Sequence, residues 1–281
     1  MFDIETETYQ EIHPSHSPPA HSRMRIVTIN DTLYSFGGIL QDKKKLNQIY
    51  TFNLVSKDWE VLPGEGIPPN PRCDPVMYGY KNKIIIYGGS EENLIFPNDL
   101  HVFDIDKKMW YKPECKGNWP SRRIGCFGTV IHQKLYIYGG GDYNRERESY
   151  DSQYDEIWSL DLESYTWKQE ITTGISPKSP IFSHWFSIGH HIVVIGINHC
   201  YFFDTVSHYW DKIEVQQLPP NPVIGLCVLA NPYTNTHNHQ QDPKNPQNKQ
   251  PSSCLPNYKL ALHFLGLSMK IDLHSFAFLY E

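Results

Sequence analysis

Short apolar runs alternate with polar turns along most of the chain, and they do so in a fixed order. The clearest copy begins at Lys83, where an apolar run ends in Gly88-Gly89 and a polar loop follows. A second apolar run then ends at Asp104, and Trp110 stands six residues further on. Runs of this length, bounded by turn residues, predict β-strands, and no long stretch has helical periodicity. The pattern therefore predicts an all-β protein.

This order recurs as an internal repeat. Gly-Gly follows an apolar, aromatic-rich run three times, at Gly37-Gly38, Gly88-Gly89 and Gly139-Gly140. An Asp or Asn is followed six residues later by an aromatic residue at six places, which are Asp3 and Tyr9, Asn53 and Trp59, Asp104 and Trp110, Asp161 and Trp167, Asp204 and Trp210, and Asp272 and Phe278. A repeat of roughly 40 to 60 residues with this content predicts a propeller or a solenoid.

We expect the repeat to build one domain from residue 1 to residue 281. Two short strands on either side of a turn are predicted within residues 1–12, and they match only the second half of the repeat. A tract rich in Asn, Gln, His and Pro, residues 231–257, lacks the apolar content to pack and is expected to be disordered. Five units of four strands are predicted, at residues 24–62, 74–112, 124–171, 182–215 and 222–281, the third with an insertion between its second and third strands.

The units resemble kelch repeats, which build β-propellers of four-stranded blades. The Gly-Gly pairs and the tryptophans carry the resemblance, which is closest over residues 23–171, partial over 182–215, and fades at both ends. It implies a propeller of about six blades, whose N-terminal half-blade lacks its two inner strands. Kelch units often carry an Arg shortly before the first strand, and Arg23, Arg72 and Arg122 stand there.

The glycines and tryptophans of the repeat are expected to serve the fold. Glycine at the end of a central strand permits positive φ and close approach of neighbouring segments. A buried Trp removes about 150 to 250 Å² from water, which is worth roughly 4 to 6 kcal/mol. We therefore assign structural roles to Trp59, Trp110, Trp167 and Trp210, and to Gly37, Gly38, Gly88, Gly89, Gly139 and Gly140.

The half-blade raises a question of ring closure. A propeller protects its strand edges by closing, and an open edge beside an unfilled half-blade invites aggregation. Our hypothesis is that the natural domain begins before Met1, or that the ring stays incomplete over these residues. A monodisperse monomer with one sharp unfolding transition at high temperature would argue against missing strands.

Composition narrows the setting in which the protein works. The net charge of −6 and the pI near 6.1 give no general attraction to phosphate, so nucleic acid is not an expected partner. The six cysteines are scattered without a Cys-x-x-Cys pair, which favours reduced, buried thiols. The first residues are acidic and lack the apolar core of a signal peptide, and no apolar run approaches the length of a membrane span. We expect a cytoplasmic, monomeric domain without membrane insertion.

No catalytic constellation, metal site or cofactor is predicted. Many of the fourteen histidines lie in a proline-rich connection, residues 13–22, or in the 231–257 tract, and His190-His191 stands at a predicted hairpin turn. No His-x-x-x-His or Cys-His spacing points to a metal. Ser183-His184 lacks the Gly-x-Ser-x-Gly elbow of a hydrolase nucleophile.

The loops between second and third strands are expected to share one face with the connections between blades. The resemblance implies that this face captures an acidic or extended peptide, and Arg suits that task through forked, charge-assisted bonds. Two alternatives stay open. The arginines before the blades could instead pair with blade carboxylates or backbone carbonyls, and the arginines in the long loop could instead pair with Glu or Asp residues of that loop. The candidate partner-binding residues are Arg23, Arg72, Arg122, Tyr143, Arg145 and Arg147.

The predicted function is recognition by a non-enzymatic adaptor or scaffold that binds another protein through this loop-bearing face. The fold alone does not fix a partner. The resemblance leaves ubiquitin-ligase, cytoskeletal and trafficking roles open. Two further alternatives are a small-molecule or sugar-processing enzyme with its site at the channel mouth, and a truncated or degenerate copy.

Overall fold

A computed structural model of the chain describes residues 2–3, 8–9, 11–144, 146–147, 149–178, 184–195, 199–214, 227–232, 258–264 and 267–272. The chain forms two compact units, residues 1–214 and 215–281. Strands dominate the described residues of both units, and the one helical segment in these ranges is a single 3₁₀ turn, η1 (Glu92–Leu94). In those same ranges, no helix has the length and apolar content needed to cross a membrane.

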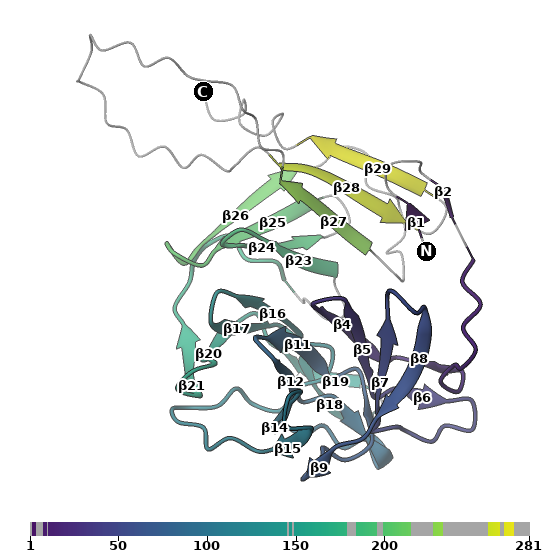
Figure 1. The fold of residues 1–281 in the computed structure, drawn as a ribbon. Helices are drawn as coiled ribbons and strands as arrows, with labels where there is room; N and C mark the ends of the chain where they lie inside the picture. The colour runs from purple at the N-terminus through teal and green to yellow at the C-terminus, as the bar shows by residue number, and fades with distance from the viewer. Residues whose placement is uncertain are drawn as a thin grey trace. The chain divides into compact units, whose positions relative to one another are not determined.

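The described part of the first unit contains four sets of four antiparallel strands, and each set is paired in sequence order within one sheet (Figure 1). We call them blades 1 to 4, because each is a four-stranded blade of a β-propeller, which confirms the predicted fold. Their strands are β4 (Arg25–Ile29), β5 (Thr32–Phe36), β7 (Ile49–Asn53) and β8 (Asp58–Leu62); β11 (Val76–Tyr80), β12 (Lys83–Tyr87), β14 (Leu100–Asp104) and β15 (Met109–Tyr111); β16 (Phe127–Ile131), β17 (Lys134–Tyr138), β20 (Ile157–Asp161) and β21 (Thr166–Glu170); and β23 (His184–Ile188), β24 (His191–Ile195), β25 (His199–Asp204) and β26 (Tyr209–Glu214).

The number of complete blades differs from the expected number. Four are complete among the described residues, and the fifth predicted unit appears in the second compact unit as a three-stranded sheet. Its strands are β27 (Cys227–Pro232), β28 (Tyr258–Phe264) and β29 (Leu267–Asp272). The last residues of the fifth predicted unit, 273–281, and nearly all of the 231–257 tract lie outside the described residues. A single ring over residues 1–281 stays a prediction.

The two strands predicted within residues 1–12 form a short ladder. Strand β1 (Phe2–Asp3) pairs antiparallel with β2 (Thr8–Tyr9), so the two predicted strands form a hairpin. The turn between them lies outside the described residues.

The first strands of successive blades lie side by side. Strand β11 lies next to β4 and to β16, and β16 lies next to β23. Glycine is required where they crowd together, since a Cβ on Gly128 in β16 would lie 2.2 Å from the Val76 side chain in β11. This packing brings the same ends of neighbouring blades together.

Aromatic contacts join each blade to the one before it. The Trp in the fourth strand packs against the aromatic residue that precedes Gly-Gly in the previous blade, and all three of these tryptophans are at most 5% exposed. The pairs are Trp110 with Phe36, Trp167 with Tyr87, and Trp210 with Tyr138, at ring-centroid distances of 5.6, 5.4 and 5.0 Å. Trp59 in blade 1 is half-buried and packs against Phe52 of its own blade. The tryptophans therefore fill the space between sheets.

At each of these contacts, a glycine that follows the fourth strand packs against the backbone of the Trp in the next blade. Gly66, Gly117 and Gly174 each stand seven residues after the Trp of their own blade, and each has a positive φ. A Cβ at any of them would lie 2.0 to 2.3 Å from the carbonyl oxygen of the Trp in the next blade. Two of them belong to short strands, β9 (Glu65–Gly66) and β22 (Thr173–Gly174), that pair parallel with β15 and β26.

We expect Gly66→Ala to lower the free energy of unfolding by about 2 to 5 kcal/mol, because alanine adds both left-handed backbone strain and a steric clash. Gly88→Ala is the matched control, since Gly88 has a φ of +60° but a Cβ there would come no closer than 3.3 Å to a neighbour, the carbonyl oxygen of Pro97. The control should lose only the backbone cost of about 1 to 2 kcal/mol. Urea unfolding measures both, and equal losses would show that the approach to Trp110 does not matter.

Candidate functional site

One end of the blades carries both the loops after Gly-Gly and the connections that precede the first strands. Within a blade these two segments pair with each other. Strand β3 (His21–Ser22) pairs with β6 (Ile39–Leu40), and β10 (Arg72–Cys73) pairs with β13 (Ser90–Glu91). In blade 3, Ile124 pairs with Gly141. We call this end the loop face, and define it by the described residues within 19–24, 37–48, 67–75, 88–99, 118–126 and 139–156.

The Gly-Gly pairs make this pairing possible. Gly88 and Gly89 have φ values of +60° and +101°, which turn the chain back toward the connection. A Cβ on Gly89 would lie 2.9 Å from the carbonyl oxygen of Cys73. Only a residue without a side chain fits there, so the repeat signature sets the geometry of the loop face.

Side chains also tie neighbouring blades together across the loop face. The buried Lys45 in the blade 1 loop donates from Nζ to Ser90 Oγ, at 3.0 Å, and to the carbonyl oxygen of Glu91 in blade 2. The ring of Phe96 in the blade 2 loop meets that of Tyr143 in blade 3, with centroids 6.0 Å apart. Loops of successive blades are therefore held in fixed relation.

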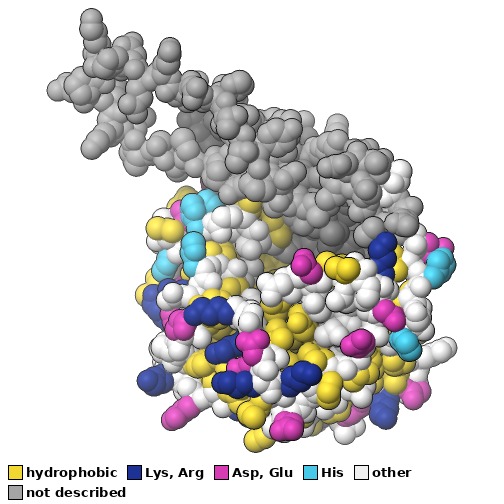
Figure 2. Space-filling model, viewed as in Figure 1, with side chains coloured by type: hydrophobic (Ala, Val, Ile, Leu, Met, Phe, Trp, Pro, Cys, Tyr) yellow, Lys and Arg dark blue, Asp and Glu magenta, His cyan; other side chains and the backbone are white. Residues whose placement is uncertain are grey.

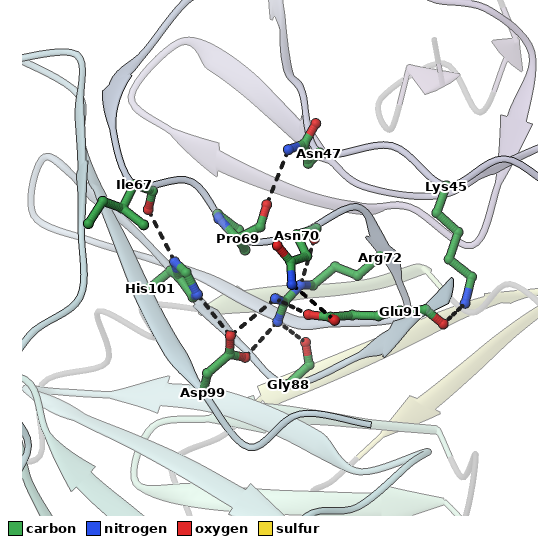
Figure 3. A network of polar contacts seen from close by, with 10 residues as sticks. All are labelled: Lys45, Asn47, Ile67, Pro69, Asn70, Arg72, Gly88, Glu91, Asp99 and His101. Atoms are coloured by element: carbon green, nitrogen blue, oxygen red, sulfur yellow. Dashed lines mark hydrogen bonds and ion pairs between the residues drawn. The ribbon is translucent and has the colours of Figure 1, made fainter. Parts of the chain in front are cut away.

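A buried arginine anchors the blade 2 part of the loop face (Figure 3). Arg72 has an exposed fraction of 0%, and its guanidinium donates to both carboxylate oxygens of Asp99, at 2.7 and 3.2 Å. It also donates to Glu91 Oε1 at 2.7 Å and to the carbonyl oxygens of Gly88 and Asn70, at 2.8 and 3.0 Å. These five bonds match the five N–H donors of arginine. The cation is fully satisfied inside the protein.

Asp99 is held ionised by this network. Burial opposes ionisation, but hydrogen bonds from His101 and Arg72 outweigh it, so the pKa of the Asp99 carboxyl lies below its usual range. His101 is buried, with Nε2 2.9 Å from Asp99 Oδ2 and Nδ1 3.3 Å from the carbonyl oxygen of Ile67. The network therefore reaches from the blade 2 loop to the connection that enters the blade.

Blade 3 repeats this arrangement with Arg123, which the sequence pattern did not single out. Arg72 donates to Gly88, sixteen residues on, and Arg123 donates to Gly139 over the same spacing, at 3.0 Å. Arg123 is also buried and donates to Glu156 Oε1 at 2.6 Å. Arg122 is instead 71% exposed, with Nε 4.0 Å from Asp142. Arg123 is thus the structural counterpart of Arg72, and Arg122 faces solvent beside it.

The predicted partner-binding role of Arg72 is corrected by its burial. A fully buried guanidinium with every donor engaged cannot contact a partner, so Arg72 holds the loops in place. In blade 1 the equivalent position, sixteen residues before Gly37, is His21, whose Nδ1 lies 2.5 Å from the carbonyl oxygen of Pro19. Arg23 is 46% exposed and forms an ion pair with Asp74 of the next connection. The three predicted arginines therefore occupy three different environments.

The insertion in blade 3 forms a hairpin of its own, which the sequence did not predict. Strand β18 (Gly141–Asn144) pairs with β19 (Ser149–Gln153), and Tyr143 is half-buried in the first strand. The Asn144 side chain accepts hydrogen bonds from the backbone N–H groups of Glu146 and Arg147, at 2.9 and 3.1 Å. Arg147 is exposed at the tip, and Arg145 lies outside the described residues.

The exposed part of the loop face mixes charged and apolar side chains. Leu94 and Ile95 are 44% and 47% exposed in the blade 2 loop. The charged side chains exposed on this face include Asp42, Lys43, Lys44, Glu92, Arg122 and Arg147. Figure 2 shows basic, acidic and hydrophobic side chains interspersed over the face in view. Such a mixture suits a protein partner better than a uniform polyanion.

Comparison with known proteins places this fold in a family. Residues 24–232 match the model of the KLHDC2/KLHL20/DRC7 Kelch-repeats domain. The chain belongs to the kelch-repeat family. Kelch repeats generally mediate interactions between proteins.

Several known proteins are similar to this chain over much of its length. It is 32% identical to kelch domain-containing protein 1 of Homo sapiens over 187 residues, which cover 57% of this chain and 44% of that protein. It is 22% identical to kelch domain-containing protein 2 of Bos taurus over 272 residues, covering 87% and 62%. Acyl-CoA-binding domain-containing protein 4 of Arabidopsis thaliana is 29% identical over 192 residues, covering 67% and 27%. The chain thus spans less than two thirds of the length of each.

Proposed function

We propose that this kelch domain is a non-enzymatic adaptor or scaffold that binds a partner protein through its loop face, in the cytoplasm. The observation that carries the proposal is the way buried ion pairs fix these loops while leaving selected side chains exposed. The buried Arg72 and Arg123 hold the loops of blades 2 and 3 through hydrogen bonds and ion pairs. Arg122 and Arg147 are exposed to solvent at the same end of the blades. A rigid surface loses little conformational entropy on binding, which favours affinity.

An acidic or extended segment is the kind of partner that the exposed residues fit. Arg122 and Arg147 can form forked bonds with carboxylates, and Lys43 and Lys44 add positive charge on the blade 1 loop. Leu94 and Ile95 offer apolar area beside them. Together they combine apolar contact with directional charge, as protein interfaces commonly do.

Reversing the exposed charges should abolish partner capture without unfolding the domain. We expect that a partner enriched from cell lysate by the native chain is lost with Arg122→Glu/Arg147→Glu, and that the purified partner binds the variant at least about tenfold more weakly, since two charge-assisted contacts become repulsive. Quantitative mass spectrometry and then calorimetry measure the two effects.

Lys107→Glu is the matched control, because Lys107 is 73% exposed in the β14–β15 turn at the opposite end of blade 2. It should bind the partner like the native chain. If both variants retain the same partner with the native affinity, the loop face is not the binding surface. If Lys107→Glu alone loses it, the interface lies at the opposite end.

A further inference from the structure

Two histidines and an aspartate meet at the end of blade 4 opposite the loop face. His190 stands in the turn before β24, His191 begins β24, and Asp204 ends β25. One potential ligand atom from each lies within 4.8 Å of the other two. The two imidazole centroids are 4.1 Å apart, and Nε2 of His190 is 3.9 Å from Oδ1 of Asp204.

The pairing of β24 with β25 brings these side chains together. His191 and Asp204 are direct cross-strand partners, so their side chains leave the same face of the sheet. The carbonyl oxygen of His190 accepts hydrogen bonds from the N–H and the hydroxyl of Thr205, at 3.1 and 2.7 Å. The turn that carries His190 is thereby fastened to the residue after Asp204, and the three groups are held in place by backbone geometry.

The same positions in other blades carry different chemistry. The cross-strand pair is Lys83 with Asp104 in blade 2 and Lys134 with Asp161 in blade 3. Gln133 takes the place of His190 in blade 3 and donates to Asp161 at 3.2 Å. Blade 3 thus has an amide and an ammonium at these two positions, and the amide donates to the aspartate. Blade 4 replaces both with imidazoles, which can ligate a metal as an ammonium cannot.

We propose that His190, His191 and Asp204 bind a divalent transition-metal cation of the Zn²⁺ class through two imidazole nitrogens and one carboxylate oxygen, with a remaining coordination position for water. Borderline cations of this class favour such mixed nitrogen and oxygen sites. All three residues are partly exposed, so an ion can reach them from solvent.

The three groups offer the ligand forms that the metal needs. A neutral imidazole offers the lone pair of one ring nitrogen to a metal. Asp204 accepts the backbone N–H groups of Val206 and Ser207 on Oδ1, at 2.7 and 3.3 Å, and a carboxylate has about four lone-pair sites on its two oxygens, so it can also ligate a cation. Metal bonds of about 2.0 to 2.2 Å bring ligand atoms to roughly 3.5 Å from one another. Side-chain rotation that moves a ligand atom by about one ångström achieves this.

The test is a titration of the full chain with Co²⁺, followed by displacement with Zn²⁺. We expect one equivalent to bind with the visible absorption of a four-coordinate cobalt site, and Zn²⁺ to raise the Tm. His190→Gln/His191→Lys copies the blade 3 residues into blade 4 and should weaken binding more than about 100-fold while leaving the metal-free Tm unchanged. The reciprocal change, Gln133→His/Lys134→His, should add a second equivalent beside Asp161.

Binding of the metal at other surface histidines is the competing explanation that the controls must exclude. His13 is 79% exposed in the N-terminal connection, and His13→Ser should leave the single equivalent intact. If the native chain and His190→Gln/His191→Lys bind Co²⁺ with the same affinity and stoichiometry, the metal is held at other histidines and the proposal is overturned. Absence of any saturable binding by the native chain would overturn it equally.

Discussion

Arg72→Met is expected to lower the free energy of unfolding by about 3 to 5 kcal/mol, the cost of breaking a buried ion pair from one side. Methionine has a similar length, so the loss arises mainly from charge and not from volume. The carboxylates of Asp99 and Glu91 would stay largely enclosed without their cation, and two carbonyl oxygens would lose their donor. Urea unfolding at neutral pH measures the effect.

Arg122→Met is the control, because it removes the same side chain at a site where the guanidinium is 71% exposed. Its effect should stay within about 0.5 kcal/mol. Arg72→Lys should fall between the two, since lysine keeps the charge but cannot reproduce the forked bonds to Asp99. A small, equal loss for Arg72→Met and Arg122→Met would mean that the network does not hold the loop face together.

Trp110→Ala is expected to cost about 3 to 5 kcal/mol, as large core truncations of aromatic residues do. Trp110 is 5% exposed and lies between Phe36 of blade 1 and Phe103 of its own blade, with ring centroids 5.6 and 5.0 Å away. Alanine would leave a cavity between two sheets, and the fixed carbonyl contact at Gly66 would hinder its collapse. Thermal and urea unfolding both report the loss.

Trp119→Ala provides the comparison within the same residue type. Trp119 is 36% exposed on the connection into blade 3 and touches Trp167 from outside, with ring centroids 5.8 Å apart. We expect a loss of about 1 kcal/mol, the usual size of an exposed aromatic contact. If Trp119→Ala proves as costly as Trp110→Ala, packing between blades does not depend on the repeat tryptophans in the way that their burial indicates.

The strands were predictable because each blade is locally encoded. Apolar runs, polar turns and Gly-Gly pairs lie within one unit, and the strands of blades 1 and 2 lie within the predicted units 24–62 and 74–112. The hairpin formed by β18 and β19 was missed because its residues are mostly polar. Its strands pair through a bulge at Asp142 and Tyr143 and a turn capped by Asn144. Neither feature produces the alternation of apolar and polar residues from which strands are predicted.

The candidate site was less predictable, because it depends on register between segments. An arginine was expected before each of the first three blades, but whether Arg122 or Arg123 points inward depends on which of them lies opposite Gly139. Likewise, His191 and Asp204 are thirteen residues apart in sequence and become neighbours only through the β24–β25 ladder. Spacing rules for metal ligands on one helix or turn do not include such a pair.

The sequence by itself determined the all-β class, the kelch repeat, and the glycine and tryptophan positions, because these follow from local periodicity and from side-chain size. The tertiary structure decided which arginines are buried and which face solvent, and it brought two histidines to one aspartate. The physical reason is that burial and cross-strand neighbourhood belong to pairs of segments. A one-residue change of register moves a side chain from the core to solvent, and composition alone cannot specify it.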